Sequence, residues 1–319
     1  MATLLVTRPL PERVIAALDP GFSTEVRLAT VPLTPEAMID ALAKYDAIIP
    51  TLGDPLSAAV IGQVVELKSK VLANFGVDYN HIDVAAASER GILVSNTPGA
   101  VTDATADIAM TLILATCRRA GEGERALRAG NWEGWHPTQF LGMHVTGKTL
   151  GIIGMGRIGK AIAKRAALGF DMEVVFFNRS PIQHPGVPAR QLANLGDVCA
   201  AADIVVVAVP ATPATHHIID ADALAALQSH AVLINIARGD VVDEAALIGA
   251  LQSGGIGGAG LDVYEREPIV PDALKAMDNV TLLPHLGTAA LEVRENMGLM
   301  AVENLNAWIS GAPLPNRVS

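Results

Sequence analysis

From residue 149 onward, short apolar runs rich in Val, Ile and Leu alternate with segments of helical character, and this rhythm limits the possible folds more than any other feature. The runs read "TLGIIG", "EVVFF", "DIVVVAV", "AVLINIA", "GAGLDV" and "VTLLPH". Strands that are apolar along their length and separated by helices are typical of a parallel sheet covered on both faces. We therefore predict a doubly wound α/β domain in this half of the chain.

The first hundred residues repeat this rhythm more weakly, in "LLVT", "TEVRLA", "DAIIP", "KVLANF" and "GILVSN", which predicts a second, smaller α/β unit. A long stretch of helical character follows, "DATADIAMTLILATCRRAGEGERALRAG", with a predicted break near Gly121 and Gly123. The tail after His285 predicts one helix, "ALEVRENMGLMAVENLNAWISG", which is long enough to pack back onto the first unit.

Composition and charge exclude several classes of protein. The 319 residues are 50% hydrophobic, which is enough for one large or two medium domains. A net charge of -10 without a basic block disfavours nucleic acid as a partner. Cys117 and Cys199 supply neither a disulfide framework nor a thiolate metal site, and adjacent His216 and His217 lack carboxylates at ligand spacing. From these cysteines and histidines we expect no metal ion. No apolar run approaches the roughly 18 residues of a membrane span, and we expect a cytoplasmic protein.

Three glycines form a G-x-G-x-x-G pattern, Gly154, Gly156 and Gly159, between the apolar run "KTLGII" and the helical segment "RIGKAIAKRAALG". In a strand-turn-helix of this kind, the first glycine allows a tight turn, the second admits a pyrophosphate, and the third lets the helix approach the strand. The context predicts a dinucleotide site. The alternative is that the glycines serve only a tight turn.

The next predicted strand ends differently from that of many dinucleotide-binding folds, which place an acid there to bind the ribose. In "EVVFFNRSP", the acids Asp171 and Glu173 stand at the start of the strand, and Asn178, Arg179 and Ser180 stand at its end. A guanidinium with short neutral donors suits a ribose 2′-phosphate. The stretch thus predicts a preference for NADPH over NADH, the alternative being a solvated arginine on a loop.

Three further polar residues follow the last three predicted strands: Arg238, Glu267 and His285. The carboxyl ends of parallel strands form the ligand-binding edge of an open sheet, so these side chains should converge. Histidine can give and take a proton near neutral pH, a neighbouring carboxylate favours its protonated form, and an arginine fork fits a carboxylate. The trio suits reduction of a 2-oxo acid.

Each member of the trio also has a purely structural interpretation. Arg238 could enter a helix that Asp240 caps, Glu267 could be turn surface, and His285 could be a hydrogen-bonded core histidine. Their joint placement at neighbouring strand ends favours the catalytic interpretation.

With these motifs, the chain resembles the D-isomer-specific 2-hydroxyacid dehydrogenases over nearly its full length, and within them the glyoxylate and hydroxypyruvate reductases. The stretches that carry the resemblance are "SNTPGAVTDATADIAM", "GKTLGIIGMGRIGKAIAKRA", "LINIARGDVVDEAAL", "GLDVYEREP" and "LLPHLGTA". The resemblance implies that Arg238, Glu267 and His285 are the catalytic residues. It further implies a flavodoxin-like substrate domain of residues 1–98 and 287–319, a Rossmann dinucleotide-binding domain of residues 99–286, and an active-site cleft between them.

The resemblance also extends the predicted binding sites. The residues predicted to contact the substrate are Leu52 as an apolar wall, Gly76, Val77, Asp78, Trp135, Arg238 and His285. The residues predicted to contact the cofactor are Thr105, Gly154, Met155, Gly156, Arg157, Ile158, Gly159, Asn178, Arg179, Ser180, Val209, Pro210, Ile236, Ala237, Arg238, Asp262, His285 and Gly287.

The substrate loop departs from the family pattern. The family's loop usually reads Gly-Val-Gly-Tyr-Asp and binds the substrate carboxylate through backbone N–H groups, whereas this chain has "GVDYN". Asp78 replaces a glycine. Aspartate tolerates a left-handed backbone better than most residues, but its carboxylate must point away from an anionic substrate.

A segment rich in tryptophan, "GNWEGWHPTQFLG", stands where the resemblance places a homodimer contact. Trp135 is expected either to reach the partner's active site and limit substrate size, or simply to pack in the interface.

We therefore predict an NADPH-dependent reductase that converts glyoxylate and hydroxypyruvate to glycolate and D-glycerate. One alternative is a phosphoglycerate dehydrogenase, which would need an anion site for the substrate phosphate and usually an acid at the ribose. The other is an NAD(P)H-sensing binding protein, since the family includes transcriptional corepressors that keep the fold and the trio.

Overall fold

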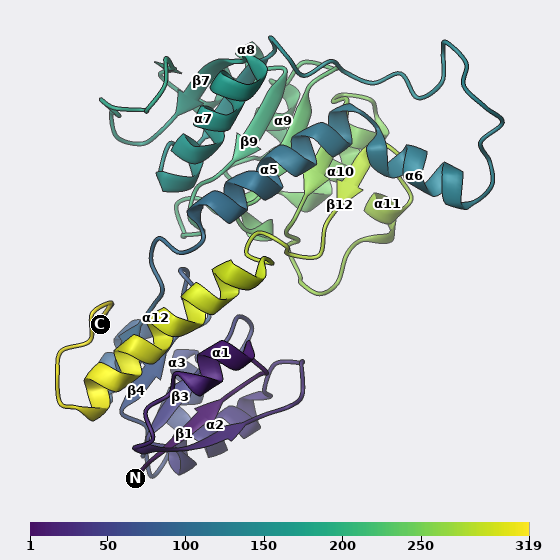
Figure 1. Cartoon of the computed structure of the whole chain (residues 1–319). Helices are drawn as coiled ribbons and strands as arrows, with labels where there is room; N and C mark the ends of the chain where they lie inside the picture. Colours follow the sequence, from purple (N-terminus) through teal and green to yellow (C-terminus); the bar gives the residue numbers. More distant parts are fainter. Residues whose placement is uncertain (319) are drawn as a thin grey trace. The chain divides into compact units, whose positions relative to one another are not determined.

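The computed structural model describes residues 1–318, which form two compact units (Figure 1). Unit 1 consists of Met1–Val101 and the segment that begins at Ala289, and unit 2 is the uninterrupted stretch Thr102–Thr288. Each unit contains a parallel sheet, so the prediction of two α/β domains is confirmed.

Unit 1 has a five-stranded sheet, described within residues 1–318, in the order β2-β1-β3-β4-β5. Its strands are β1 (Ala2–Val6), β2 (Phe22–Val26), β3 (Ala47–Ile49), β4 (Val71–Ala73) and β5 (Leu93–Ser95). Its helices are α1 (Glu12–Ala16), α2 (Pro35–Lys44), α3 (Ala58–Gln63), α4 (Val84–Glu89) and α12 (Leu291–Ile309).

Neighbouring residues of β1 belong to different cores, because successive side chains of a strand point to opposite faces. Leu5 packs in the apolar cluster that contains α2, α3 and α4 residues, whereas Leu4 and Val6 pack with Ala301 and Leu305 of α12. The C-terminal helix therefore completes one face of the first sheet, as the tail's length predicted.

Unit 2 has a seven-stranded sheet, among the described residues, in the order β12-β11-β10-β9-β6-β7-β8. Its strands are β6 (Thr149–Ile153), β7 (Glu173–Phe177), β8 (Arg190–Gln191), β9 (Ile204–Val207), β10 (Val232–Asn235), β11 (Gly258–Leu261) and β12 (Val280–Leu282). Its helices are α5 (Thr102–Cys117), α6 (Ala120–Arg128), α7 (Arg157–Phe170), α8 (Leu195–Ala201), α9 (Ala221–Ala225), α10 (Glu244–Gln252) and α11 (Asp272–Lys275), with a 3₁₀ turn at Gly239–Val241.

Helices cover both faces of this sheet. Figure 1 shows α5 lying across the sheet, and it shares an apolar cluster with α7. Residues of α8, α9 and α10 form the cluster on the other face. Ile152 belongs to the first cluster and Ile153 to the second, so β6 is buried on both sides. None of the helices within residues 1–318 is both long and apolar enough to cross a membrane.

The long helical stretch is broken as predicted, but the break lies two residues before Gly121. Helix α5 ends at Cys117 and α6 begins at Ala120, so Gly121 and Gly123 lie inside α6. The break falls at Arg119, which has a left-handed backbone with φ of 52°. Its guanidinium binds both carboxylate oxygens of Glu122, at 2.6 and 2.7 Å, and this pair stabilises the turn.

Candidate functional site

The glycine-rich turn joins β6 to α7. Gly154 donates its N–H to Phe177 O at 2.9 Å, has φ of +103°, and would bring a Cβ within 2.8 Å of Ala208 O. Gly156 is the N-cap of α7, and a Cβ there would meet no atom within 4 Å. At Gly159 a Cβ would clash with the carbonyl of Gly154. The turn is therefore tight at its ends and open at the start of the helix, which fits a bound pyrophosphate.

The end of β7 is connected to this turn through Asn178. Its Oδ1 accepts from Met155 N at 3.2 Å, and its Nδ2 donates to Ser180 O at 2.9 Å. The amide is thus engaged within the chain. Arg179 and Ser180 are exposed, and Glu173 begins the strand at its opposite end. An anion at this strand end would meet a guanidinium rather than a carboxylate.

A histidine and a glutamate meet beyond the ends of β11 and β12. His285 Nδ1 and Glu267 Oε2 are 2.8 Å apart, and Glu267 Oε1 accepts from Tyr264 N at 3.1 Å. Both side chains of the pair are about three-tenths exposed, at 27% and 31%. Both carboxylate oxygens of Glu267 therefore have a hydrogen-bond partner, and Glu267 fixes the Nδ1 atom of His285.

Opposing effects act on the carboxyl of Glu267. Burial favours its protonated form, but the hydrogen bond and charge of His285, the N–H of Tyr264 and the guanidinium of Arg238 outweigh burial. The pKa of Glu267 therefore lies below its usual value. The site keeps a negative charge beside the imidazole at neutral pH.

Asp262, at the end of β11, fixes the segment that carries His285. Its buried carboxylate accepts from Leu286 N at 2.6 Å and Gly287 N at 2.8 Å, while its carbonyl accepts from His285 N at 2.9 Å. Thr105 of α5 donates to Gly287 O at 3.2 Å. Burial raises the pKa of Asp262, and the two N–H bonds offset only part of that effect. Asp262 and Thr105, both predicted to contact the cofactor, thus bind the backbone of residues 285–287.

Arg238 follows β10, in the turn before Gly239. Asn235 orders this turn, because its Nδ2 donates to Arg238 O at 2.9 Å and its Oδ1 accepts from Ala237 N at 3.0 Å. The charge of Arg238 acts on Glu267, so unit 2 brings the predicted trio together at the carboxyl ends of β10, β11 and β12. The remaining predicted cofactor residues follow β9, follow β10 or begin α7: Val209, Pro210, Ile236, Ala237, Arg157 and Ile158.

The predicted substrate loop belongs to unit 1, where it follows β4. Asn74 Nδ2 donates to Gly76 O at 3.1 Å and to Asp78 O at 3.0 Å, and Asn96 Nδ2 donates to Val77 O at 2.7 Å. Three successive carbonyls of the loop are therefore held by asparagine side chains. The sequence interpretation missed both asparagines, although each directly follows a strand.

Two predicted residues are exposed and lie outside the helices and strands. Leu52 of unit 1 follows β3 and is 42% exposed, and Trp135 of unit 2 is 81% exposed in a segment without helix or strand. Among residues 1–318, no three His, Cys, Asp or Glu side chains gather in a way that could hold a metal ion.

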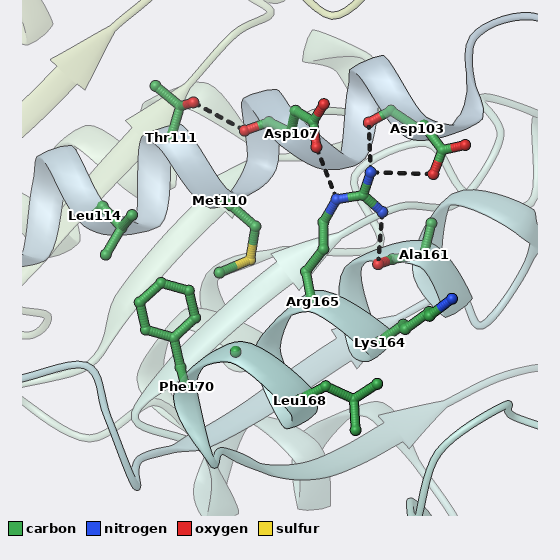
Figure 2. Close-up of a pocket in the computed structure, with 11 residues that line it drawn as sticks. Asp103, Asp107, Met110, Thr111, Leu114, Ala161, Lys164, Arg165, Leu168 and Phe170 are labelled. Carbon is green, nitrogen blue, oxygen red and sulfur yellow. Dashed lines mark hydrogen bonds and ion pairs between the residues drawn. The ribbon is translucent and has the colours of Figure 1, made fainter.

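A hollow of about 790 Å³ lies between α5 and α7 (Figure 2). At one end Arg165 pairs with Asp103 and Asp107, and Met110 and Phe170 are among its apolar lining residues. None of the residues predicted to be catalytic lines it.

The chain is similar to known proteins over nearly its whole length. Residues 110–287 match the family model described as D-isomer specific 2-hydroxyacid dehydrogenase, NAD binding domain. The chain is 41% identical to the glyoxylate reductase of Pyrococcus horikoshii, over 99% of this chain and 95% of that protein.

Two solved structures have the same fold throughout. The TT0316 protein from Thermus thermophilus matches with a TM-score of 0.92 and 41% identity, over 99% of this chain and 100% of that one. The NADPH-dependent glyoxylate/hydroxypyruvate reductase from Sinorhizobium meliloti, in complex with NADP and malonate, matches with a TM-score of 0.86 and 36% identity, over 100% and 97%. Since the family model covers more than half of the chain and the relatives match nearly all of it, the chain belongs to the D-isomer-specific 2-hydroxyacid dehydrogenase family.

Proposed function

We propose that this chain is an NADPH-dependent reductase that converts small 2-oxo acids of the glyoxylate and hydroxypyruvate type to glycolate and D-glycerate. The observation that carries the proposal is the 2.8 Å contact between His285 and Glu267, with the charge of Arg238 acting on the same carboxylate. A proton donor and a carboxylate-binding cation at one sheet edge are what reduction of a 2-oxo acid requires.

Each residue has a distinct part in the proposed reaction. The hydride for C2 of the oxo acid would come from NADPH held at the glycine-rich turn. His285 gives a proton from Nε2 to the forming alkoxide, while Glu267, bonded to Nδ1, stabilises the protonated ring. Arg238 binds the carboxylate and the carbonyl oxygen with its planar fork. In unit 1, Val77 and Asp78 would offer backbone N–H groups to a substrate carboxylate, and Leu52 would offer an apolar wall.

The cofactor preference rests on the turn after β7. The glycine-rich turn and the start of α7 would hold the pyrophosphate, and Arg179 would pair with the 2′-phosphate of NADPH. The relative from Sinorhizobium meliloti is described as NADPH-dependent and was solved with NADP. No acid stands at this end of β7 to bind a free ribose hydroxyl, so NADH loses its usual contact.

Steady-state oxidation of NADPH and NADH with a panel of 2-oxo acids tests the proposal. Turnover of glyoxylate or hydroxypyruvate with NADPH supports it, whereas tight NADPH binding without turnover indicates a binding protein instead. Arg179→Ala should lower kcat/KM for NADPH by about 10- to 150-fold and leave NADH use nearly unchanged, as expected for the loss of one charged hydrogen bond.

Lys70→Ala is a matched control for the lost positive charge. Lys70 is exposed at the amino end of β4 in unit 1, away from the carboxyl ends of the strands. It should leave the ratio of NADPH to NADH use unchanged. Equal losses with both cofactors in Arg179→Ala, or a wild-type enzyme that prefers NADH, would contradict the cofactor part of the proposal.

We also propose that the protein works as a homodimer in the cytoplasm. The support is an exposed apolar group on residues 131–144: Trp132 is 51% exposed, Trp135 is 81% exposed and Leu141 is 64% exposed. Large exposed aromatic side chains are enriched at protein interfaces. Sedimentation at micromolar concentration should show a dimer, and a stable monomer would contradict this assignment. If Trp135 limits substrate size in the partner, Trp135→Ala should lower KM for larger 2-oxo acids.

A further inference from the structure

Gln191 lies on β8, the edge strand of unit 2, and its side chain binds the loop after β7 at three points. Its Nε2 donates to Asn178 O at 3.0 Å and to Ser180 O at 3.2 Å, and its Oε1 accepts from Ile182 N at 2.9 Å. Gln191 stands in register with Phe176 of β7, directly beside the end of that strand. One half-buried side chain therefore satisfies three backbone groups of a five-residue loop.

These bonds orient the backbone of Arg179. The C=O and N–H of one peptide group point in opposite directions. Because Asn178 O points toward Gln191, the N–H of Arg179 points away from β8. The loop is held from the other side by Asn178, whose Oδ1 accepts from Met155 N of the glycine-rich turn. Arg179 thus stands on a loop fixed between the edge strand and the turn expected to hold the pyrophosphate.

The chemistry of Gln191 fits this position closely. The contact needs two donors for two carbonyl oxygens and one acceptor for an N–H, all on one side chain, and a primary amide provides them. A glutamate would place an acceptor against two carbonyl oxygens. A methionine of similar length would bind none of the three groups.

We propose that Gln191 is a positioning residue for cofactor specificity, which holds the 178–182 loop so that Arg179 is preorganised to bind the 2′-phosphate of NADPH. This inference rests on the proposed preference for NADPH. A loop that is already ordered loses less conformational freedom when it binds an anion, so its affinity is higher. NADH carries no 2′-phosphate and gains nothing from this order.

Dissociation constants of NADPH and NADH, measured by cofactor fluorescence, test the inference in Gln191→Glu and Gln191→Met. Affinity for NADPH should fall about 5- to 30-fold, as for one to two neutral hydrogen bonds, with affinity for NADH within about twofold of wild type. Turnover at saturating NADPH should not change, because the reacting groups lie on other strands. Gln191→Met introduces no charge, which separates lost hydrogen bonds from electrostatic repulsion.

Gln183→Glu is the matched control. Gln183 is exposed just beyond the 178–182 loop, five residues after Asn178. Its replacement by glutamate adds the same negative charge as Gln191→Glu but removes none of the three bonds of Gln191. It should keep the NADPH to NADH ratio, and a loss equal to that of Gln191→Glu would overturn the inference. Equal losses of both cofactors in the Gln191 variants would also overturn it, since they would indicate general disorder.

The outcomes separate this inference from the proposed function. If wild type binds both cofactors equally, the proposed preference itself fails. If wild type prefers NADPH and Arg179→Ala removes that preference while Gln191→Met retains it, the function stands and the role of Gln191 is refuted.

Discussion

His285 has a φ of +54°, a left-handed backbone that residues other than glycine seldom adopt. Such a conformation persists only where neighbouring groups hold it. Here Asp262 binds the N–H groups of His285, Leu286 and Gly287 through its carbonyl and both carboxylate oxygens. Two residues therefore set the orientation of the imidazole: Asp262 holds the backbone of the His285 segment, and Glu267 holds the ring.

Replacing His285 by Gln tests its role as the proton donor. Removing a general acid typically lowers the rate by about a hundredfold or more, so kcat with glyoxylate should fall by at least that factor. The dissociation constant of NADPH, measured by fluorescence, should stay close to wild type. Near-normal turnover would remove His285 from the mechanism.

The pH dependence of the rate tests the coupling between Glu267 and His285. Glu267 Oε2 and His285 Nδ1 are 2.8 Å apart, and the hydrogen bond and charge of His285 lower the pKa of Glu267. In Glu267→Gln that negative charge is gone, and the reduction rate should begin to fall at a lower pH than in wild type. Glu265→Gln is the control, since Glu265 lies 3.4 Å from His217 instead. Identical profiles in Glu267→Gln and wild type would show that the pair is not coupled.

At the scale of elements, the turn after β10 packs directly on the turn after β11. A Cβ on Gly239 would clash with the backbone of Tyr264 and Glu265. Because Gly239 follows Arg238 and Tyr264 binds Glu267, this close approach sets the distance between two members of the trio. Only a residue without a side chain allows it.

Gly239→Ala should therefore lower both stability and activity. Overpacking of this kind costs about 1 to 3 kcal/mol of unfolding free energy, which urea denaturation will measure, and kcat/KM should fall because Arg238 is displaced. Gly249→Ala is the control. In α10 a Cβ on Gly249 meets nothing within 4 Å, so alanine there should stabilise by up to about 1 kcal/mol. Equal behaviour of the two variants would contradict the packing argument.

Most strands of the two sheets could be predicted, because fully buried strands such as β9 and β10 leave apolar runs in the sequence. Strand β8 could not, since Arg190 and Gln191 form a two-residue polar edge. The helix break was predicted near two glycines rather than at Arg119, because nothing in a single sequence shows that Arg119 takes the left-handed conformation.

The trio Arg238, Glu267 and His285 could be predicted from one rule, because the carboxyl ends of parallel strands lie at the same edge of a sheet. Residues that act by holding backbone left no such signal. Asn96 and Gln191 bind carbonyls that only the folded chain brings to them, 19 residues away for Val77 and 13 residues away for Asn178.

At the scale of the whole molecule, both cysteines are buried in unit 2. The rate at which their thiols react with a reagent therefore measures unfolding of this unit. Burial raises the pKa of Cys117 to about 12 and that of Cys199 to about 11. Since the thiolate is the reactive form, neither should react rapidly with a thiol reagent at neutral pH, and both should react once the protein is unfolded. Time courses in buffer and in urea will measure this. Rapid labelling of either thiol in buffer would contradict the described burial.

The path of the chain also determines when each unit can fold during synthesis. Unit 2 is one uninterrupted stretch, so all its strands have been made once Thr288 is added. Strand β1 of unit 1 precedes unit 2 in the chain, yet Ala301 and Leu305 of α12, which follows unit 2, complete one of the two cores of unit 1. The ribosome therefore makes β1 before unit 2 and makes α12 only after it. Until α12 emerges, the apolar face of β1 remains exposed, and a nascent chain stalled before residue 291 should bind chaperones that recognise exposed apolar strands.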